Sequence, residues 1–169
     1  MLTVWLLCSI FLALVAEVIL GNVGLRVPLF MLAAFYVTVV HGWRRPLAWL
    51  LLLGTCLDLA YGRSFPASLL AMPAVLPLAM FWRRHGDCRH AAAQALAGAA
   101  VGLLAALAAV LALVLPGARW DGALGGEVIL MLAEGALGGG LVLPLLCLGL
   151  DAVAEAMVFD RYQQVRHGR

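Results

Sequence analysis

Residues 91–115 read AAAQALAGAAVGLLAALAAVLALVL and contain no charged side chain. A helix of about 20 apolar residues is long enough to cross the hydrocarbon core of a bilayer. The stretch therefore predicts a transmembrane helix. The whole chain agrees, because 65% of its residues are hydrophobic and 12% are charged, against about 25% charged in a typical soluble domain. A soluble protein is excluded on this composition.

Further apolar blocks on both sides of this stretch predict a single all-α domain, a polytopic membrane protein with six transmembrane helices. The expected spans are residues 2–20, 25–41, 47–61, 67–82, 91–115 and 128–150. The second to fourth are short, so we expect bilayer thinning, snorkelling of Arg26 and Arg63, or shielding of the backbone by protein. Pro73 and Pro77 in the fourth span and Pro144 in the sixth predict kinks, because proline clashes with the preceding helical turn.

The arginines set the expected orientation, since all eleven basic residues of the chain are arginines. With six spans, the side that holds both termini carries Arg44, Arg45, Arg83, Arg84, Arg89, Arg161, Arg166 and Arg169. The other side carries Arg26, Arg63 and Arg119. Because short loops rich in arginine stay in the cytoplasm, we expect both termini to be cytoplasmic.

Small residues predict where the helices pack. Gly98 and Gly102 lie one turn apart in the fifth block, and Gly135 and Gly139 do so in the sixth. Helices in lipid associate through such faces, because small residues let the backbones approach closely. The partner of each face could be another helix of this chain or another protein.

Carboxylates inside the apolar blocks are expected to face the protein interior, because a charge at bilayer depth costs at least about 2.5 kcal/mol. The residues concerned are Glu17, Asp58 and Glu134. Asp58 is a candidate for a functional role or a structural hub, with Arg63 as its nearest opposite charge along the chain. Asp151 and Glu155 lie one turn apart near the end of the last helix and are expected on a solvated face at the membrane boundary.

Catalytic and metal-binding signatures are missing from the sequence. The four histidines lie at predicted edges of spans, and the sequence contains no H-E-x-x-H motif, G-x-S-x-G elbow or phosphate-binding loop. The four cysteines show no paired C-x-x-C spacing, so they are expected to behave as small hydrophobic residues. We expect a non-enzymatic protein without a cofactor, a metal or a nucleic-acid partner.

The most specific pattern lies in residues 27–90. It runs from Val27-Pro28 through the turn GWRRP at 42–46 to GTCLDLAYGRSFP at 54–66. The motif residues are Gly54, Asp58, Gly62 and Pro66. This order of elements resembles the rod-shape-determining MreD family, which consists of small membrane proteins with six helices, over about the first half of the chain. The chain departs from the family at Leu29, where an acidic residue is common, and at Ala67 and Ser68, where a glycine follows the motif proline.

The resemblance implies a scaffold subunit of the bacterial cell-elongation complex in the inner membrane. Such a subunit would bind an MreC-like protein through its helices. With MreB filaments it would help to place the peptidoglycan synthases, which are RodA and a class B penicillin-binding protein. The cytoplasmic basic loop, with Arg83, Arg84 and Arg89, would contact anionic lipid or an acidic partner surface.

A rival interpretation is the substrate-binding subunit of an energy-coupling-factor vitamin transporter, because MreD-like proteins look similar to that six-helix fold. Such a subunit would need a polar pocket near the outer face and an A-x-x-x-A helix face. Ala13 and Ala16 have the wrong spacing for that face. The outer loops offer few hydrogen-bonding side chains beyond Arg63, Ser64, Arg119 and Asp121. The sequence therefore predicts no vitamin site.

Overall fold

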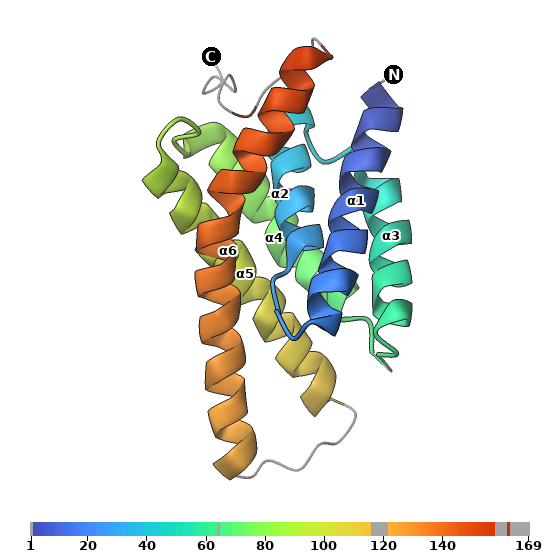
Figure 1. The fold of residues 1–169 in the computed structure, drawn as a ribbon, viewed down its shortest axis with the longest axis vertical. Coiled ribbons are helices and arrows are strands. Elements are labelled where there is room, and N and C mark those ends of the chain that lie inside the picture. Colours follow the sequence, from blue (N-terminus) through green and yellow to red (C-terminus); the bar gives the residue numbers. More distant parts are fainter. Residues whose placement is uncertain (1, 64, 116–121, 158–161, 163–169) are drawn as a thin grey trace.

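The computed structural model describes residues 2–63, 65–115, 122–157 and 162, and these form six helices and no strand (Figure 1). The helices are α1 (Leu2–Asn22), α2 (Leu29–His41), α3 (Leu47–Ala60), α4 (Ala67–His85), α5 (Ala91–Val114) and α6 (Gly122–Ala156). Three of them, α1, α5 and α6, are long and apolar enough to cross a membrane. The predicted all-α class is confirmed. Arg119, Trp120 and most of the C-terminal tail lie outside the described residues.

Two helices differ clearly from the prediction in their bounds. α2 begins at Leu29 rather than at residue 25, because a turn at residues 23–24 follows α1 and the Leu25 backbone N–H donates to the Leu20 carbonyl at 2.9 Å. α6 extends six residues beyond the predicted span at each end, from Gly122 to Ala156. Hydropathy identifies the part of a helix that suits lipid. The helix can continue beyond that part, because polar residues such as Glu127 are compatible with helix geometry.

α2 is the central helix of the molecule. Every residue from Phe30 to Val40 is buried, and α2 contacts α1, α4, α5 and α6. A helix that is surrounded by protein has no backbone or side chains exposed to lipid, so it need not match the thickness of the bilayer. Burial in protein, one of the three explanations expected for the short second block, is therefore what the structure shows for α2.

The helices connect so that the molecule has two distinct ends (Figure 1). The start of α1, the α2–α3 and α4–α5 connections and the end of α6 lie at one end, which we call the terminal end. The α1–α2 and α3–α4 connections lie towards the opposite end, which we call the distal end. There α5 and α6 extend past the other four helices as a hairpin (Figure 1).

The prolines do not divide the helices that contain them. α4 is one continuous helix through Pro73 and Pro77, and α6 is continuous through Pro144. α6 nevertheless changes direction along its length (Figure 1), as expected for a helix that contains a proline. Pro73 and Pro77 lie on the exposed side of α4.

The most extensive contact between helices joins α5 and α6. A Cβ atom added to Gly98 would overlap the carbonyl oxygen of Gly139, and one added to Gly102 would overlap the carbonyl oxygen of Gly135. The predicted packing faces are therefore confirmed. Their partner is a helix of the same chain, which settles the alternative that the sequence left open.

Replacing Gly102 by alanine should lower the free energy of unfolding by about 1–3 kcal/mol, because the new methyl group forces two backbones apart. Unfolding in mixed micelles, followed by circular dichroism, measures this change. Gly149→Ala is the matched control on α6, since a Cβ there meets nothing within 4 Å. Alanine favours the helix over glycine by about 1 kcal/mol, so the control should be neutral or stabilising. Equal effects of the two substitutions would contradict the close α5–α6 contact.

Candidate functional site

Asp58 lies near the end of α3 and is 4% exposed. Its carboxylate accepts hydrogen bonds from the Ser68 backbone N–H at 3.0 and 3.2 Å and from the Ser68 hydroxyl at 3.1 Å. It also pairs with the Arg63 guanidinium at 3.1 Å. The predicted pairing with Arg63 is confirmed, whereas the role of Ser68 was not predicted. Both carboxylate oxygens have donors, so the buried charge is compensated.

Asp58 acts as a cap for a helix other than its own. Ser68 is the second residue of α4, and the capping position before α4 is Pro66, which provides no side-chain hydrogen bond. The first backbone N–H groups of a helix need acceptors and favour negative charge. Asp58 supplies this acceptor from α3, and a buried hydrogen-bonded joint therefore connects α3 to α4.

The other motif residues shape the same joint. Gly62 has a φ of +61°, a left-handed conformation that glycine adopts without strain. The turn also brings the Arg63 backbone N–H within 3.0 Å of the Asp58 carbonyl oxygen. Gly54 lies one turn before Asp58, where an added Cβ would be in van der Waals contact with Phe30 and Ser68 at 3.4 Å. The motif therefore builds a structural connection among α2, α3 and α4.

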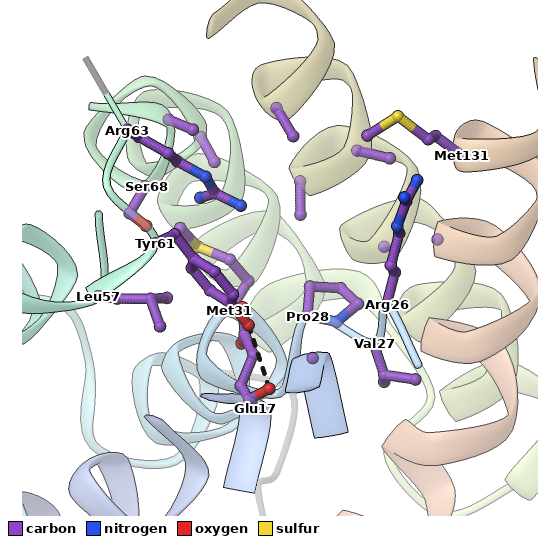
Figure 2. Close-up of a pocket in the computed structure, with 18 residues that line it drawn as sticks. Glu17, Arg26, Val27, Pro28, Met31, Leu57, Tyr61, Arg63, Ser68 and Met131 are labelled. Atoms are coloured by element: carbon purple, nitrogen blue, oxygen red, sulfur yellow. Dashed lines mark hydrogen bonds between the residues drawn. The ribbon is translucent and has the colours of Figure 1, made fainter. Parts of the chain in front are cut away.

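A cavity of about 260 Å³ lies beside this joint towards the distal end (Figure 2). Its polar lining consists of Glu17, Arg26, Tyr61, Arg63 and Ser68. Alanines and glycines of α4, α5 and α6 form much of the remaining wall. The expectation that this end lacks convergent polar groups is wrong, because Glu17, Tyr61 and Ser68 come from helix ends rather than from loops. Glu17 and Arg26 lie on either side of the α1–α2 turn. This was the signal in the sequence that could have placed both in the lining of one cavity.

The polar groups of the cavity differ in how many hydrogen-bond partners they have. One oxygen of Glu17, Oε2, accepts the Phe30 backbone N–H at 2.7 Å, and the Tyr61 hydroxyl donates to the Glu17 carbonyl oxygen at 3.1 Å. The Arg63 guanidinium lies over the Tyr61 ring, 4.7 Å from its centroid. Among the described residues, Glu17 Oε1 and the Arg26 guanidinium have no hydrogen-bond or ion-pair partner. The Arg26 side chain is exposed, so solvent can hydrate its guanidinium, and Glu17 Oε1 is an acceptor in the cavity lining that has no donor among the described residues.

Asp151 is buried at the terminal end, where it is 7% exposed. Its Oδ1 accepts hydrogen bonds from the Tyr36 hydroxyl at 2.6 Å and from the Tyr162 backbone N–H at 2.7 Å. The prediction of a solvated face is therefore wrong for Asp151, although Glu155 is exposed as expected. Tyr36 comes from the central helix α2, and its ring stacks on that of Tyr162 with centroids 5.6 Å apart. This long-range contact covers the carboxylate.

Glu134 lies on the exposed surface of α6, so the prediction that it faces the interior is wrong. On the side of α6 that faces the protein interior near Glu134, Gly135 and Gly139 pack against α5. Glu134 makes no hydrogen bond or ion pair with the residues that the structure describes.

The predicted basic loop is only partly a loop, because Arg83 and Arg84 lie in the last turn of α4, and Arg89 lies in the α4–α5 connection at the terminal end. Arg84 and Arg89 are exposed and Arg83 is half-buried. Asp87 accepts the Arg89 backbone N–H at 2.8 Å and contacts His90 Nδ1 at 2.5 Å. These two interactions lower the pKa of Asp87 and hold the loop in shape. Within the described ranges, no group of three His, Cys, Asp or Glu side chains could hold a metal ion.

Replacing Asp58 by leucine should lower the free energy of unfolding by about 3 kcal/mol, because it leaves Arg63 unpaired and removes the cap of α4. Asp58→Asn should cost about 1 kcal/mol, since an amide oxygen still accepts hydrogen bonds. Asp151→Leu should lower the free energy of unfolding as much as Asp58→Leu, because it leaves the buried Tyr36 hydroxyl without its hydrogen-bond acceptor. Denaturant unfolding in mixed micelles measures all three, with the exposed Glu127→Leu as control. If Asp58→Leu were as mild as the control, the joint would have no energetic importance.

Comparisons with protein-family models, with curated proteins and with solved structures found no match to this chain. The resemblance to the MreD family therefore rests on the motif residues and the order of helices.

Proposed function

We propose that this chain is a non-enzymatic scaffold subunit of the MreD type, with six spans in a bacterial inner membrane and an MreC-like partner bound to its helices. In this role it helps to organise MreB filaments, RodA and a class B penicillin-binding protein. The observation that carries the proposal is the position of Glu134 on the outer surface of α6. The described residues form six helices with short connections, so this part of the protein offers partners its helix faces and short loops.

Glu134 lies within an exposed apolar stripe along α6. The stripe, which we call the α6 stripe, consists of Leu130, Leu137, Leu141, Leu145 and Leu148 together with Glu134. These positions recur at helical spacing and lie on the side of α6 opposite the glycines that contact α5. Leu137 and Leu141 are 68% and 72% exposed. The stripe is therefore available to lipid or to another helix.

A carboxylate on such a stripe favours a partner helix over lipid. Lipid chains offer no hydrogen-bond donor, and a charge at bilayer depth costs at least about 2.5 kcal/mol. Glu134 neighbours Gly135, which packs against Gly102 in the middle part of α5. A partner helix with a hydrogen-bond donor opposite Glu134 would donate to its carboxylate. The small or apolar residues of that helix would cover the leucines of the α6 stripe.

The distribution of arginines supports the proposed orientation. Arg44, Arg45, Arg84 and Arg89 are exposed, and all four lie in or next to connections at the terminal end. The start of α1 and the end of α6 lie at that same end (Figure 1). Cytoplasmic termini would place these arginines against anionic lipid, where each contributes about 1 kcal/mol, or against an acidic surface of a cytoplasmic partner.

The second candidate is a substrate-binding subunit of an energy-coupling-factor vitamin transporter. The distal cavity favours this candidate, because it combines small apolar residues with polar groups such as Glu17 and Arg26. The two candidates predict different partners. A scaffold should co-purify with a single-span, coiled-coil protein, and a transporter subunit should co-purify with a transmembrane coupling protein and its ATPases.

Replacing Glu134 by leucine should reduce capture of the MreC-like partner at least tenfold, because the partner's donor loses its acceptor. Glu134→Gln should be milder, since the amide oxygen still accepts a hydrogen bond. Co-purification in mild detergent, with quantification of the partner, measures the effect. Glu127→Leu is the matched control, because Glu127 is also exposed on α6 but lies nearer the tip of the hairpin. Unchanged capture by Glu134→Leu would remove the main support for the scaffold proposal.

A further inference from the structure

We propose that the helix that covers the α6 stripe belongs to a different protein and carries a long basic side chain, an arginine or a lysine, opposite Glu134. This inference rests on the proposed function and gives the partner of the α6 stripe a chemical character. The other candidates for this surface are a second copy of this chain and lipid.

The α6 stripe is one continuous surface along α6. From Leu130 to Leu148 it runs for about five helical turns, or about 27 Å, and both end residues are more than half exposed. The buried residues Gly135, Gly139 and Leu143 lie on another side of the helix. Glu134 is the single polar side chain of the stripe, so a helix that covers this surface meets leucines and one carboxylate.

α6 itself does not neutralise Glu134. It contains no arginine, lysine or histidine, and Glu134 makes no ion pair or hydrogen bond with the residues that the structure describes. An ionised carboxylate at bilayer depth is costly, and so is an arginine or a lysine. Contact between the two reduces both costs at once, because charge-assisted hydrogen bonds are stronger than neutral ones. The stripe therefore favours a cation over a neutral donor.

A second copy of this chain does not suit the stripe through its own α6. Copies of one membrane protein share one orientation, so a symmetric pair places the same residue on both sides of its two-fold axis. Glu134 would then lie opposite the same glutamate of the second copy, and like charges disfavour each other at short range. Since α6 has no basic residue, the second α6 could not compensate either carboxylate.

The leucines around Glu134 determine how long the partner's side chain must be. At the α5–α6 contact, glycines let the two backbones approach closely. On the stripe, Leu130, Leu137 and Leu141 keep the backbone of a second helix further away, since helix axes usually lie roughly 8–10 Å apart. A serine or threonine hydroxyl stays near its own backbone and often bonds to a carbonyl of its own helix. Arginine and lysine have long stems and reach further.

The test uses model helices as partners of the full chain. A single-span helix of leucine and alanine, fused to a soluble reporter that stays in the cytoplasm, is co-expressed with the tagged protein. In the first version, an arginine lies level with Glu134, which is about 24 Å from Leu150 along α6. In the second the arginine lies two turns nearer the cytoplasm, and in the third a serine replaces it. Capture in mild detergent should be at least tenfold greater for the first version than for the others.

Reversing the charge of the stripe should reverse its preference. Glu134→Arg should capture a model helix that has a glutamate level with position 134, and it should no longer capture the arginine helix. Glu134→Leu should not distinguish the versions. Glu127→Leu, the matched control on α6, should behave as the wild-type chain does. Two differently tagged copies of the wild-type chain should not co-purify.

Equal capture of the three model helices by the wild-type chain would overturn the proposal. Capture of none of them would leave the stripe to lipid, and co-purification of the two tagged copies through the stripe would assign it to a second copy. Both results would also overturn the proposal. The model helices contain no sequence of an MreC-like protein. If the arginine helix is captured and the MreC-like protein is not, the scaffold proposal alone fails, and the reverse result overturns this inference alone.

Discussion

A charged group that leaves water must find hydrogen-bond partners, and this constraint determines how the helices of this chain meet. At the distal end, Asp58 is buried and its partners come from the α3–α4 turn and the first turn of α4. At the terminal end, Asp151 is buried and its partners are Tyr36 in α2 and Tyr162 beyond α6. Apolar packing alone would leave the helices free to slide or rotate, whereas these two carboxylates fix particular residues opposite one another.

The same constraint connects the fold to the proposed functions. Glu134 is a carboxylate on an apolar, exposed stripe, so its partner must come from another molecule if this part of α6 lies in lipid. Glu17 Oε1 lines the distal cavity and has no donor among the described residues. Carboxylates with hydrogen-bond partners thus hold the structure together, whereas Glu134, which has no partner among the described residues, marks a place where the protein should bind another molecule.

Local sequence patterns predicted the helices and one contact between them. The six helices, the pairing of Asp58 with Arg63 and the glycine faces of α5 and α6 follow from composition, short spacing and small-residue periodicity. The errors at the carboxylates concern the direction of side chains. Asp151 is covered by Tyr36, 115 residues away in the chain, and Glu134 faces outwards because glycine occupies the contact with α5. Neither outcome can be derived without knowing which helices are neighbours.

The central claim is that the α6 stripe around Glu134 is covered by another protein, and crosslinking from the stripe tests it most directly. A photoreactive amino acid at Leu137 should crosslink in native membranes to one single-span membrane protein. The same probe at Leu96, which is 67% exposed on α5, should react with lipid. Crosslinking of Leu137 to lipid alone, as at Leu96, would contradict the account.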